Sequence, residues 1–184
     1  MKNKLILHLQ SGDGDEGGIA NYISLLINAK EMKKFNHIVS VKKIYKKLYL
    51  KYPFSNLIEF NCDYSLTNFL QRVFKLRHIY STNQYPLIHS HALRAGLICA
   101  FLKLIFNINF LHTNHGLRYK QKNFYKAFFY FVFEIFVLIC STNYVCVRYK
   151  DFLYLKSFIK LNFLLKKIKV IRLNLDIDYN LYAS

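Results

Sequence analysis

The chain has 184 residues, of which 53% are hydrophobic and 17% aromatic, and its 27 Lys and Arg against 10 Asp and Glu give a formal net charge of +17. This length suits one domain with a substantial core, and the apolar content excludes an intrinsically disordered chain despite the charge. The positive charge attracts phosphates, nucleotides, nucleic acid or anionic lipid without choosing among them.

Seven short apolar runs predict β-strands, at Leu5–Leu9, His37–Val41, Leu57–Phe60, Leu87–His89, Asn109–Thr113, Tyr144–Val147 and Lys169–Leu173. Longer segments with helical periodicity or length separate most of them, at Ile19–Lys33, Leu66–His78, Leu93–Phe106 and Asn123–Leu138. This alternation predicts an α/β fold, a single Rossmann-like domain whose mostly parallel sheet has helices on both faces. In such sheets ligands bind beyond the carboxyl ends of the strands, so the residues that follow each strand are the candidates for a binding site.

Two glycines follow the first strand, and the next helix is expected to begin just after them. Gly17 and Gly18 precede Ile19, where exposed backbone N–H groups and the helix dipole favour a bound phosphate. A flexible turn without a ligand is the alternative. The segment matches neither GxGxxG nor GxxxxGK[ST], which disfavours a redox dinucleotide or a P-loop.

Four histidines lie at the ends of two later strands. His89 and His91 alternate along one strand and therefore face the same side of the sheet, and His112 and His115 end another. Metal binding is disfavoured, because no Asp or Glu occurs between Asp63 and Glu134 and no HExxH or HxxxH spacing is present. We therefore expect polar contacts and no metal site.

The segment around His115 carries the strongest indication of chemistry. A histidine in a loop after a strand can shuttle a proton or donate to a developing charge, and Gly116 permits a tight turn beside it. Arg94, behind His91, and Arg118, behind His115, have the planar guanidinium that pairs with phosphate. Solvated surface charge is the alternative for both arginines.

The most apolar segment, Ala127–Cys140, is interrupted by Glu134 and is shorter than the roughly 20 residues that span a bilayer. We expect a core helix, with a membrane-surface helix as the alternative because a basic cluster precedes its aromatic rings. The apolar run Leu5–Leu9 is too short for a signal peptide, and the four cysteines lack CxxC or zinc spacing. A cytoplasmic location follows, and the lipid alternative adds peripheral attachment at the inner face of the membrane.

Five segments in order resemble the N-terminal domain of the family 4 glycosyltransferases, enzymes of the two-domain GT-B fold. They are the first strand with Gly17-Gly18, the I-H-x-H strand and helix at Leu87–Gly96, the T-x-H-G loop at His112–Gly116, the strand at Ser141–Val147, and Val170–Asp178. Residues 1–173 would form this domain and residues 174–184 would begin the interdomain linker. The resemblance thus covers nearly the whole chain and ends before the family's donor-binding domain.

The resemblance implies the acceptor-binding half of a retaining glycosyltransferase, inactive alone, that passes a sugar from a nucleotide-sugar to a polysaccharide or lipid-linked acceptor. His115 would be the catalytic residue. The substrate-binding residues would be Gly17, Gly18, His91, Arg94, Gly116, Arg118 and Asn174. The nucleotide-sugar is a donor substrate, so no cofactor is expected.

The expected partners are the nucleotide-sugar, bound together with a separate C-terminal half, a glycan or glycolipid acceptor, and an anionic membrane surface. The main alternative is a non-catalytic product of a truncated or split gene that binds anionic ligands or a partner subunit. Nucleic acid is not expected, because the chain has no RNP motif, zinc-finger spacing or clear helix-turn-helix.

Overall fold

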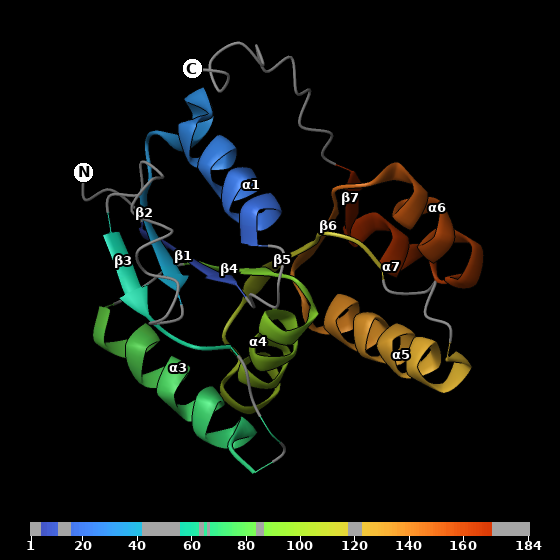
Figure 1. The fold of residues 1–184 in the computed structure, drawn as a ribbon. Helices are drawn as coiled ribbons and strands as arrows, with labels where there is room; N and C mark the ends of the chain where they lie inside the picture. The colour runs from blue at the N-terminus through green and yellow to red at the C-terminus, as the bar shows by residue number, and fades with distance from the viewer. Residues whose placement is uncertain are drawn as a thin grey trace.

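Seven parallel strands form one sheet in the computed structural model, which describes residues 5–10, 16–41, 56–62, 65, 67–83, 87–117 and 123–170 (Figure 1). The strand order is β3-β2-β1-β4-β5-β6-β7, and every adjacent pair is parallel. The strands are β1 Leu5–Gln10, β2 Asn36–Val41, β3 Asn56–Glu59, β4 Leu87–His91, β5 Phe110–Asn114, β6 Asn143–Cys146 and β7 Ile168–Val170. The predicted Rossmann-like α/β domain is confirmed.

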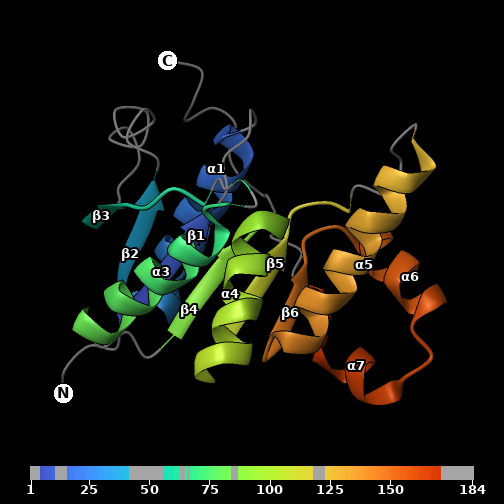
Figure 2. The same cartoon turned by 90° about the horizontal axis from the view of Figure 1, so that it is seen from below.

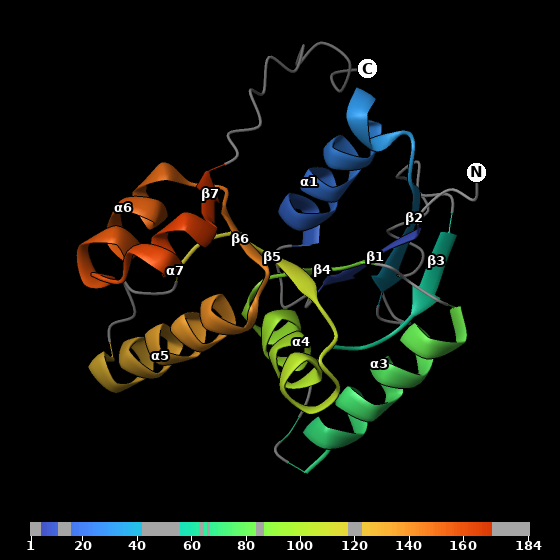
Figure 3. The ribbon, with the colours of Figure 1, turned by 180° about the vertical axis from the view of Figure 1, so that it is seen from behind.

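Helices cover both faces of the sheet. One face carries α1 and the opposite face carries α3, α4 and α5 side by side, while α6 and α7 lie near the β7 edge (Figures 1, 2 and 3). The helices are α1 Glu16–Asn28, α3 Phe69–Asn83, α4 Leu93–Phe106, α5 Phe124–Cys140, α6 Tyr149–Phe158 and α7 Asn162–Lys167, with a 3-10 turn at Lys30–Met32.

The start of α1 differs from the prediction. The helix begins at Glu16 instead of Ile19, so Gly17 and Gly18 lie in its first turn and not in a preceding loop. The first N–H groups of any helix have no partner within the helix, so the backbone donors of this turn lie where the helix itself does not use them. The glycines therefore keep the position expected for them beside a strand end, but on a helix.

The two sides of the sheet differ in chemistry because side chains alternate along each strand. On the side of α3, α4 and α5, Leu7, Ile88 and Phe110 belong to the larger apolar core. On the α1 side the apolar cluster is small and includes Ile23 and Val39, and buried polar side chains of the central strands, such as His8 and His91, lie on this side too. The polar ligand-type side chains of the central strands are thus concentrated beneath α1.

Helix α5 is only partly a core helix, which corrects the expectation. Asn123 caps its first turn by accepting a hydrogen bond from the backbone N–H of Lys126 at 3.1 Å. Glu134 is buried, whereas Phe124 and Phe128 are 75% and 53% exposed. No helix within the described ranges combines the length and apolar character needed to cross a membrane.

Candidate functional site

The candidate site lies where the strand order reverses, between β1 and β4. From β1 the chain proceeds to β2 and β3 on one side, and then returns to place β4 and β5 on the other. Gln10 at the end of β1 pairs with His91 at the end of β4, which pairs in turn with Thr113 of β5. A reversal of this kind opens a crevice at the carboxyl ends of the strands, where α/β proteins bind ligands.

Four histidines from separate segments join end to end on the α1 side. His37 Nδ1 lies 3.0 Å from His8 Nε2, His8 Nδ1 lies 3.2 Å from His91 Nε2, and His91 Nδ1 lies 3.1 Å from His115 Nε2. The inner end is fixed by the backbone, because His37 Nε2 lies 2.9 Å from the carbonyl oxygen of Met32. We call this arrangement the histidine row.

Burial keeps three rings of the row neutral, those of His8, His91 and His115. It lowers the pKa of His8 and of His91 well below the usual 6.5, and that of His115 to about 4. The histidines also lower one another's pKa by charge repulsion, with His89 the largest such contributor for both His8 and His91. At neutral pH His8, His91 and His115 are therefore neutral imidazoles, each with one N–H donor and one bare acceptor nitrogen.

An aromatic residue of α1 closes the outer part of the row. The Tyr22 ring stands edge-on to His115, with ring centroids 4.9 Å apart, and burial raises the pKa of its hydroxyl. Gly18 lies one turn earlier on the same helix, and an added Cβ there would meet nothing within 4 Å. The first turns of α1 thus combine an anchored aromatic ring with an open backbone.

Three imidazoles come close enough together to be considered as metal ligands. One ligand nitrogen from each of His8, His89 and His91 lies within 4.8 Å of the others. The facing nitrogens of His8 and His91 are already within hydrogen-bond distance, and His89 Nε2 lies 2.7 Å from the Thr113 hydroxyl. Because these contacts account for the facing nitrogens as hydrogen bonds, we do not assign a metal to the group.

The loop that carries His115 is held at both ends. The Gly116 N–H donates to Asn114 Oδ1 at 2.6 Å, and the Leu117 N–H donates to Asp151 Oδ2 at 3.3 Å. Asp151 is buried and is itself held by two hydrogen bonds from the Arg148 guanidinium, at 2.8 and 3.0 Å. The backbone at His115 therefore has little freedom.

Only glycine suits position 116. Its φ of +148° lies in a region that L-residues rarely adopt. A Cβ would in addition lie 2.6 Å from a guanidinium nitrogen of Arg148, whose side chain is fixed on Asp151. The predicted tight turn beside His115 thus has both a conformational and a steric cause.

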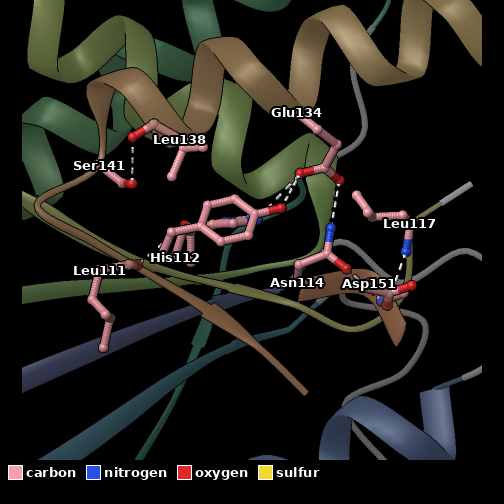
Figure 4. A network of polar contacts seen from close by, with 11 residues as sticks. Leu111, His112, Asn114, Leu117, Glu134, Leu138, Ser141 and Asp151 are labelled. Atoms are coloured by element: carbon pink, nitrogen blue, oxygen red, sulfur yellow. Dashed lines mark hydrogen bonds and ion pairs between the residues drawn. The ribbon is translucent and has the colours of Figure 1, made fainter. Parts of the chain in front are cut away.

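A buried carboxylate of α5 supports the same loop from the opposite face of the sheet (Figure 4). Glu134 accepts hydrogen bonds from Asn114 Nδ2 at 2.8 Å and from the Tyr144 hydroxyl at 2.7 Å. Asn114 also accepts a hydrogen bond from the Gly116 N–H, so its amide links Glu134 to the loop that carries His115. The acidic residue that interrupts the apolar segment is therefore a structural support for the site.

His112 belongs to this opposite face and not to the histidine row. Its Nδ1 lies 2.9 Å from the Ser90 hydroxyl, and its Nε2 lies 4.0 Å from Glu134 without a hydrogen-bond partner. That separation from Glu134 would suit an ion pair, but burial lowers the pKa of His112 to about 3, so the ring is neutral. We treat the contact as a dipole facing a carboxylate.

The backbone between His91 and α4 is strained. Ala92 has φ 65° and ψ 161°, a combination found almost only at glycine. Its N–H donates to the Thr113 carbonyl at 3.1 Å, and its carbonyl accepts from the Gly96 N–H at 3.1 Å. Strain of this kind, fixed by hydrogen bonds on both sides, is typical of ligand-binding and active sites.

The structure brings some of the predicted site residues together and separates others. His91, His115 and Gly116 are adjacent, and Gly18 lies on the helix beside them. Arg94 is in the first turn of α4 with an exposed side chain. Gly17 lies in α1, whereas Arg118 and Asn174 lie outside the described residues, so their predicted roles stay predictions.

Sequence reasoning missed His8, His37, Tyr22 and Glu134 as parts of the site. The two histidines are separated from His91 by other strands in the sequence and become its neighbours only through the strand order. Glu134 did carry a signal, because a carboxylate within an apolar helix must find partners when it is buried.

Comparisons with known proteins identify the fold. No protein-family model matches the chain, and no curated protein matches it. The chain is similar to HepE from Anabaena, solved in complex with UDP, with a TM-score of 0.66 and 15% identity over 97% of this chain and 46% of HepE. It is also similar to MurG from Acinetobacter baumannii, with a TM-score of 0.61 and 6% identity over 91% of this chain and 44% of MurG.

A third similar structure is UDP-N-acetylglucosamine 2-epimerase from Rickettsia bellii, with a TM-score of 0.64 and 10% identity over 91% of this chain and 44% of the epimerase. The chain thus spans slightly under half the length of the proteins it matches. Together these matches show that it has the fold of one Rossmann-like half of a GT-B protein. A fold of this kind hosts different reactions, so the fold alone does not select the reaction.

Proposed function

We propose that the chain is the acceptor-binding half of a retaining glycosyltransferase similar to family 4, which moves a sugar from a nucleotide-sugar to a polysaccharide or lipid-linked acceptor. Residues 1–173 form the domain and residues 174–184 begin the linker to a donor-binding half. His115 is the catalytic residue. Gly17, Gly18, His91, Arg94, Gly116, Arg118 and Asn174 bind the substrates.

One observation carries the proposal: the motif residues that resemble family 4 gather at the strand reversal. His91 and His115 lie 3.1 Å apart, although 24 residues separate them in the sequence. The strained Ala92 and the doubly held turn at Gly116 border the same pair. Buried histidines that served only to fill the core would not require a strained backbone beside them.

The test uses the enzyme that contains this chain together with its donor-binding half, joined in one chain or supplied by a neighbouring gene. His115→Ala should lower kcat/KM for sugar transfer by at least about 100-fold, since removal of a positioned acid or base has an effect of that order. The matched control is His78→Ala, because His78 is exposed on α3 and lies outside the site.

Turnover that His115→Ala leaves unchanged would remove this residue from the site. Conversion of a nucleotide-sugar to its epimer without any acceptor would replace the transferase by an epimerase. If no donor-binding half is encoded beside the chain, the non-catalytic alternative is favoured.

We further propose that the exposed stripe of α5 rests on an anionic membrane surface and brings a lipid-linked acceptor to the site. The stripe is defined by residues spaced at helical repeat, Phe124, Tyr125, Phe128, Phe129, Val132 and Phe133, each at least 42% exposed. Exposed apolar area of this kind marks a contact surface. The exposed Lys126 lies on the same helix, and its positive charge favours anionic lipid over a neutral partner.

Vesicle co-sedimentation tests this part. The chain should bind phosphatidylcholine vesicles that contain phosphatidylglycerol, and it should bind less at high salt because salt screens the lysines. Phe128→Ser with Phe129→Ser should abolish binding. The control pair, Leu70→Ser with Phe74→Ser on α3, changes side chains of matching exposure, 53% and 54%, and should bind like the wild type. Equal binding to vesicles without phosphatidylglycerol would contradict the proposal.

A further inference from the structure

Two buried carboxylates converge on one short loop (Figure 4). Among the side chains that the structure describes, Glu134 of α5 and Asp151 of α6 are the buried acidic residues. The chain has only 10 acidic residues against 27 basic ones, and a carboxylate that leaves water needs partners to replace its hydration. Both carboxylates find a partner in residues 114–117, which we call the His115 loop.

The two carboxylates hold the loop on either side of its histidine. On one side Glu134 accepts from Asn114 Nδ2 at 2.8 Å, and the Oδ1 of the same amide accepts from the Gly116 N–H at 2.6 Å. On the other side Asp151 Oδ2 accepts from the Leu117 N–H at 3.3 Å. The loop is therefore fixed from α5 and from α6 at once.

The His115 imidazole itself meets other neighbours, at the strand reversal. Its Nε2 lies 3.1 Å from His91 Nδ1, and the Tyr22 ring stands edge-on to it with ring centroids 4.9 Å apart. The two carboxylates instead bond to an amide side chain and to a backbone N–H of the loop. Since both carboxylates are buried, they can set where the imidazole lies without meeting a substrate.

Each carboxylate is also held from outside the loop. The Tyr144 hydroxyl donates to Glu134 at 2.7 Å, and burial together with the charge of Glu134 raises the pKa of this hydroxyl, which keeps it a donor. The Arg148 guanidinium donates twice to Asp151, at 2.8 and 3.0 Å. The carboxylates thus have fixed positions of their own and resist any movement of the loop.

We propose that Glu134 and Asp151 are positioning residues for the reaction, which act through the His115 loop to hold the His115 imidazole against the substrate. The inference rests on the proposed function, because it assigns both residues to that site. A displacement of about 1 Å at a reacting group can lower a rate roughly 100-fold, so the loop contacts matter for turnover as well as for folding.

Variants of Asp151 in the assembled enzyme test the contact with the loop. Asp151→Ala removes the acceptor of the Leu117 N–H and should lower kcat roughly 10- to 100-fold, while the KM for the nucleotide-sugar stays unchanged. Asp151→Asn keeps an oxygen for this N–H and should restore most of the rate, because Arg148 has a side chain that is 54% exposed and can turn to solvent. The control Glu59→Gln changes an exposed carboxylate of β3 and should leave kcat unchanged.

Rates are compared at a temperature where circular dichroism shows every variant to be folded. A folded Asp151→Ala enzyme with the wild-type kcat would overturn the proposal. If Asp151→Asn were as slow as Asp151→Ala, the charge and not the bond to the loop would be responsible, and positioning through the loop would be overturned as well.

Combination with His115→Ala separates positioning from a general loss of structure. If both carboxylates act through His115, adding Asp151→Ala or Glu134→Gln to His115→Ala should not slow transfer further, because no imidazole is left to position. Losses that multiply would overturn the proposal.

Amide hydrogen exchange measures the loop without any reaction. In the complete chain labelled with ¹⁵N, Asp151→Ala should speed exchange of the Leu117 N–H roughly tenfold, and Glu134→Gln should do the same for Gly116. The amide of Leu7 in β1 is the internal control for global opening. Loop amides that exchange as in the wild type in both variants would overturn the proposal. Failure of His115→Ala to affect transfer would refute the proposed function while the exchange result stands, so the two failures can be told apart.

Discussion

Gly96 lies in α4 where the helix crosses His112 of β5 and Val137 of α5, and Gly96→Ala tests how tightly that crossing is packed. The new Cβ would lie 2.7 Å from His112 Cε1 and 2.9 Å from Val137 Cγ1. His112 cannot simply withdraw, because its Nδ1 is bonded to Ser90 at 2.9 Å. One of these neighbours must shift.

The expected cost follows from three terms. Overpacking a core costs about 1–3 kcal/mol, and weakening the buried bond between Ser90 and His112 costs about 1 kcal/mol. Replacing Gly by Ala in a helix returns about 1 kcal/mol. Gly96→Ala should therefore lower the free energy of unfolding by about 1–3 kcal/mol, the sum of these terms.

Urea denaturation followed by circular dichroism measures this change, with Gly18→Ala as the matched control. Gly18 is also helical, but a Cβ there meets nothing within 4 Å, so this variant should be unchanged or stabilised by up to about 1 kcal/mol. With a urea dependence of about 2 kcal/mol per molar, the two midpoints should differ by roughly 1 M. Equal stability of Gly96→Ala and Gly18→Ala would show that the crossing of α4 with His112 and Val137 is less tightly packed than these distances indicate.

Three further predictions concern titration, the buried network and backbone strain. Burial lowers the pKa of His115 to about 4, so below pH 6.5 the unfolded chain binds a proton that the folded chain does not. As the pH falls from 6.5 to 4, this group should therefore lower the free energy of unfolding by up to about 1.4 kcal/mol per pH unit. Urea midpoints that stay constant over this range would contradict that. Glu134→Gln should lower the free energy of unfolding by about 1–3 kcal/mol, because a glutamine amide cannot accept hydrogen bonds from both the Asn114 amide and the Tyr144 hydroxyl. A double-mutant cycle with Tyr144→Phe should give a coupling energy above about 0.5 kcal/mol. Additive effects of the two substitutions would exclude the contact. Ala92→Gly should raise the free energy of unfolding by about 1 kcal/mol, because glycine relieves the backbone strain at this position. The control Ala95→Gly, in the regular part of α4, should lower the free energy of unfolding. A lower free energy of unfolding in both variants would show that Ala92 is not strained.

Much of the fold could be predicted from local pattern, because parallel strands buried on both faces give short continuous apolar runs. β1 is an example, with Leu7 and Leu9 fully buried. The helices α6 and α7 were not predicted, since lysines are interspersed through both and only a few of their residues, such as Leu155 and Leu164, are buried. A short helix with so narrow a buried stripe leaves little periodicity to detect.

The candidate site was predictable only in part, for a reason that lies in the sheet. The alternation of His89 and His91 correctly placed both on one face, because strand periodicity is a local property. The contact of His8 with His37 and His91 depends on which strands are neighbours, and that is not a local property. The same alternation places His112 on the opposite face from His91.

The central position of β1 has a consequence for synthesis on the ribosome. The contact between His8 and His91 joins residues 83 positions apart, so β1 emerges long before its second neighbour exists. Pairings between distant segments form slowly, and an unpaired parallel strand is exposed to wrong partners in the interval. The segment β1–α1–β2 can associate early, but the row of imidazoles is completed only when residue 115 has left the exit tunnel. This chain therefore assembles its candidate site late, and a chaperone that shields the open side of β1 during that interval would raise the yield of folded protein.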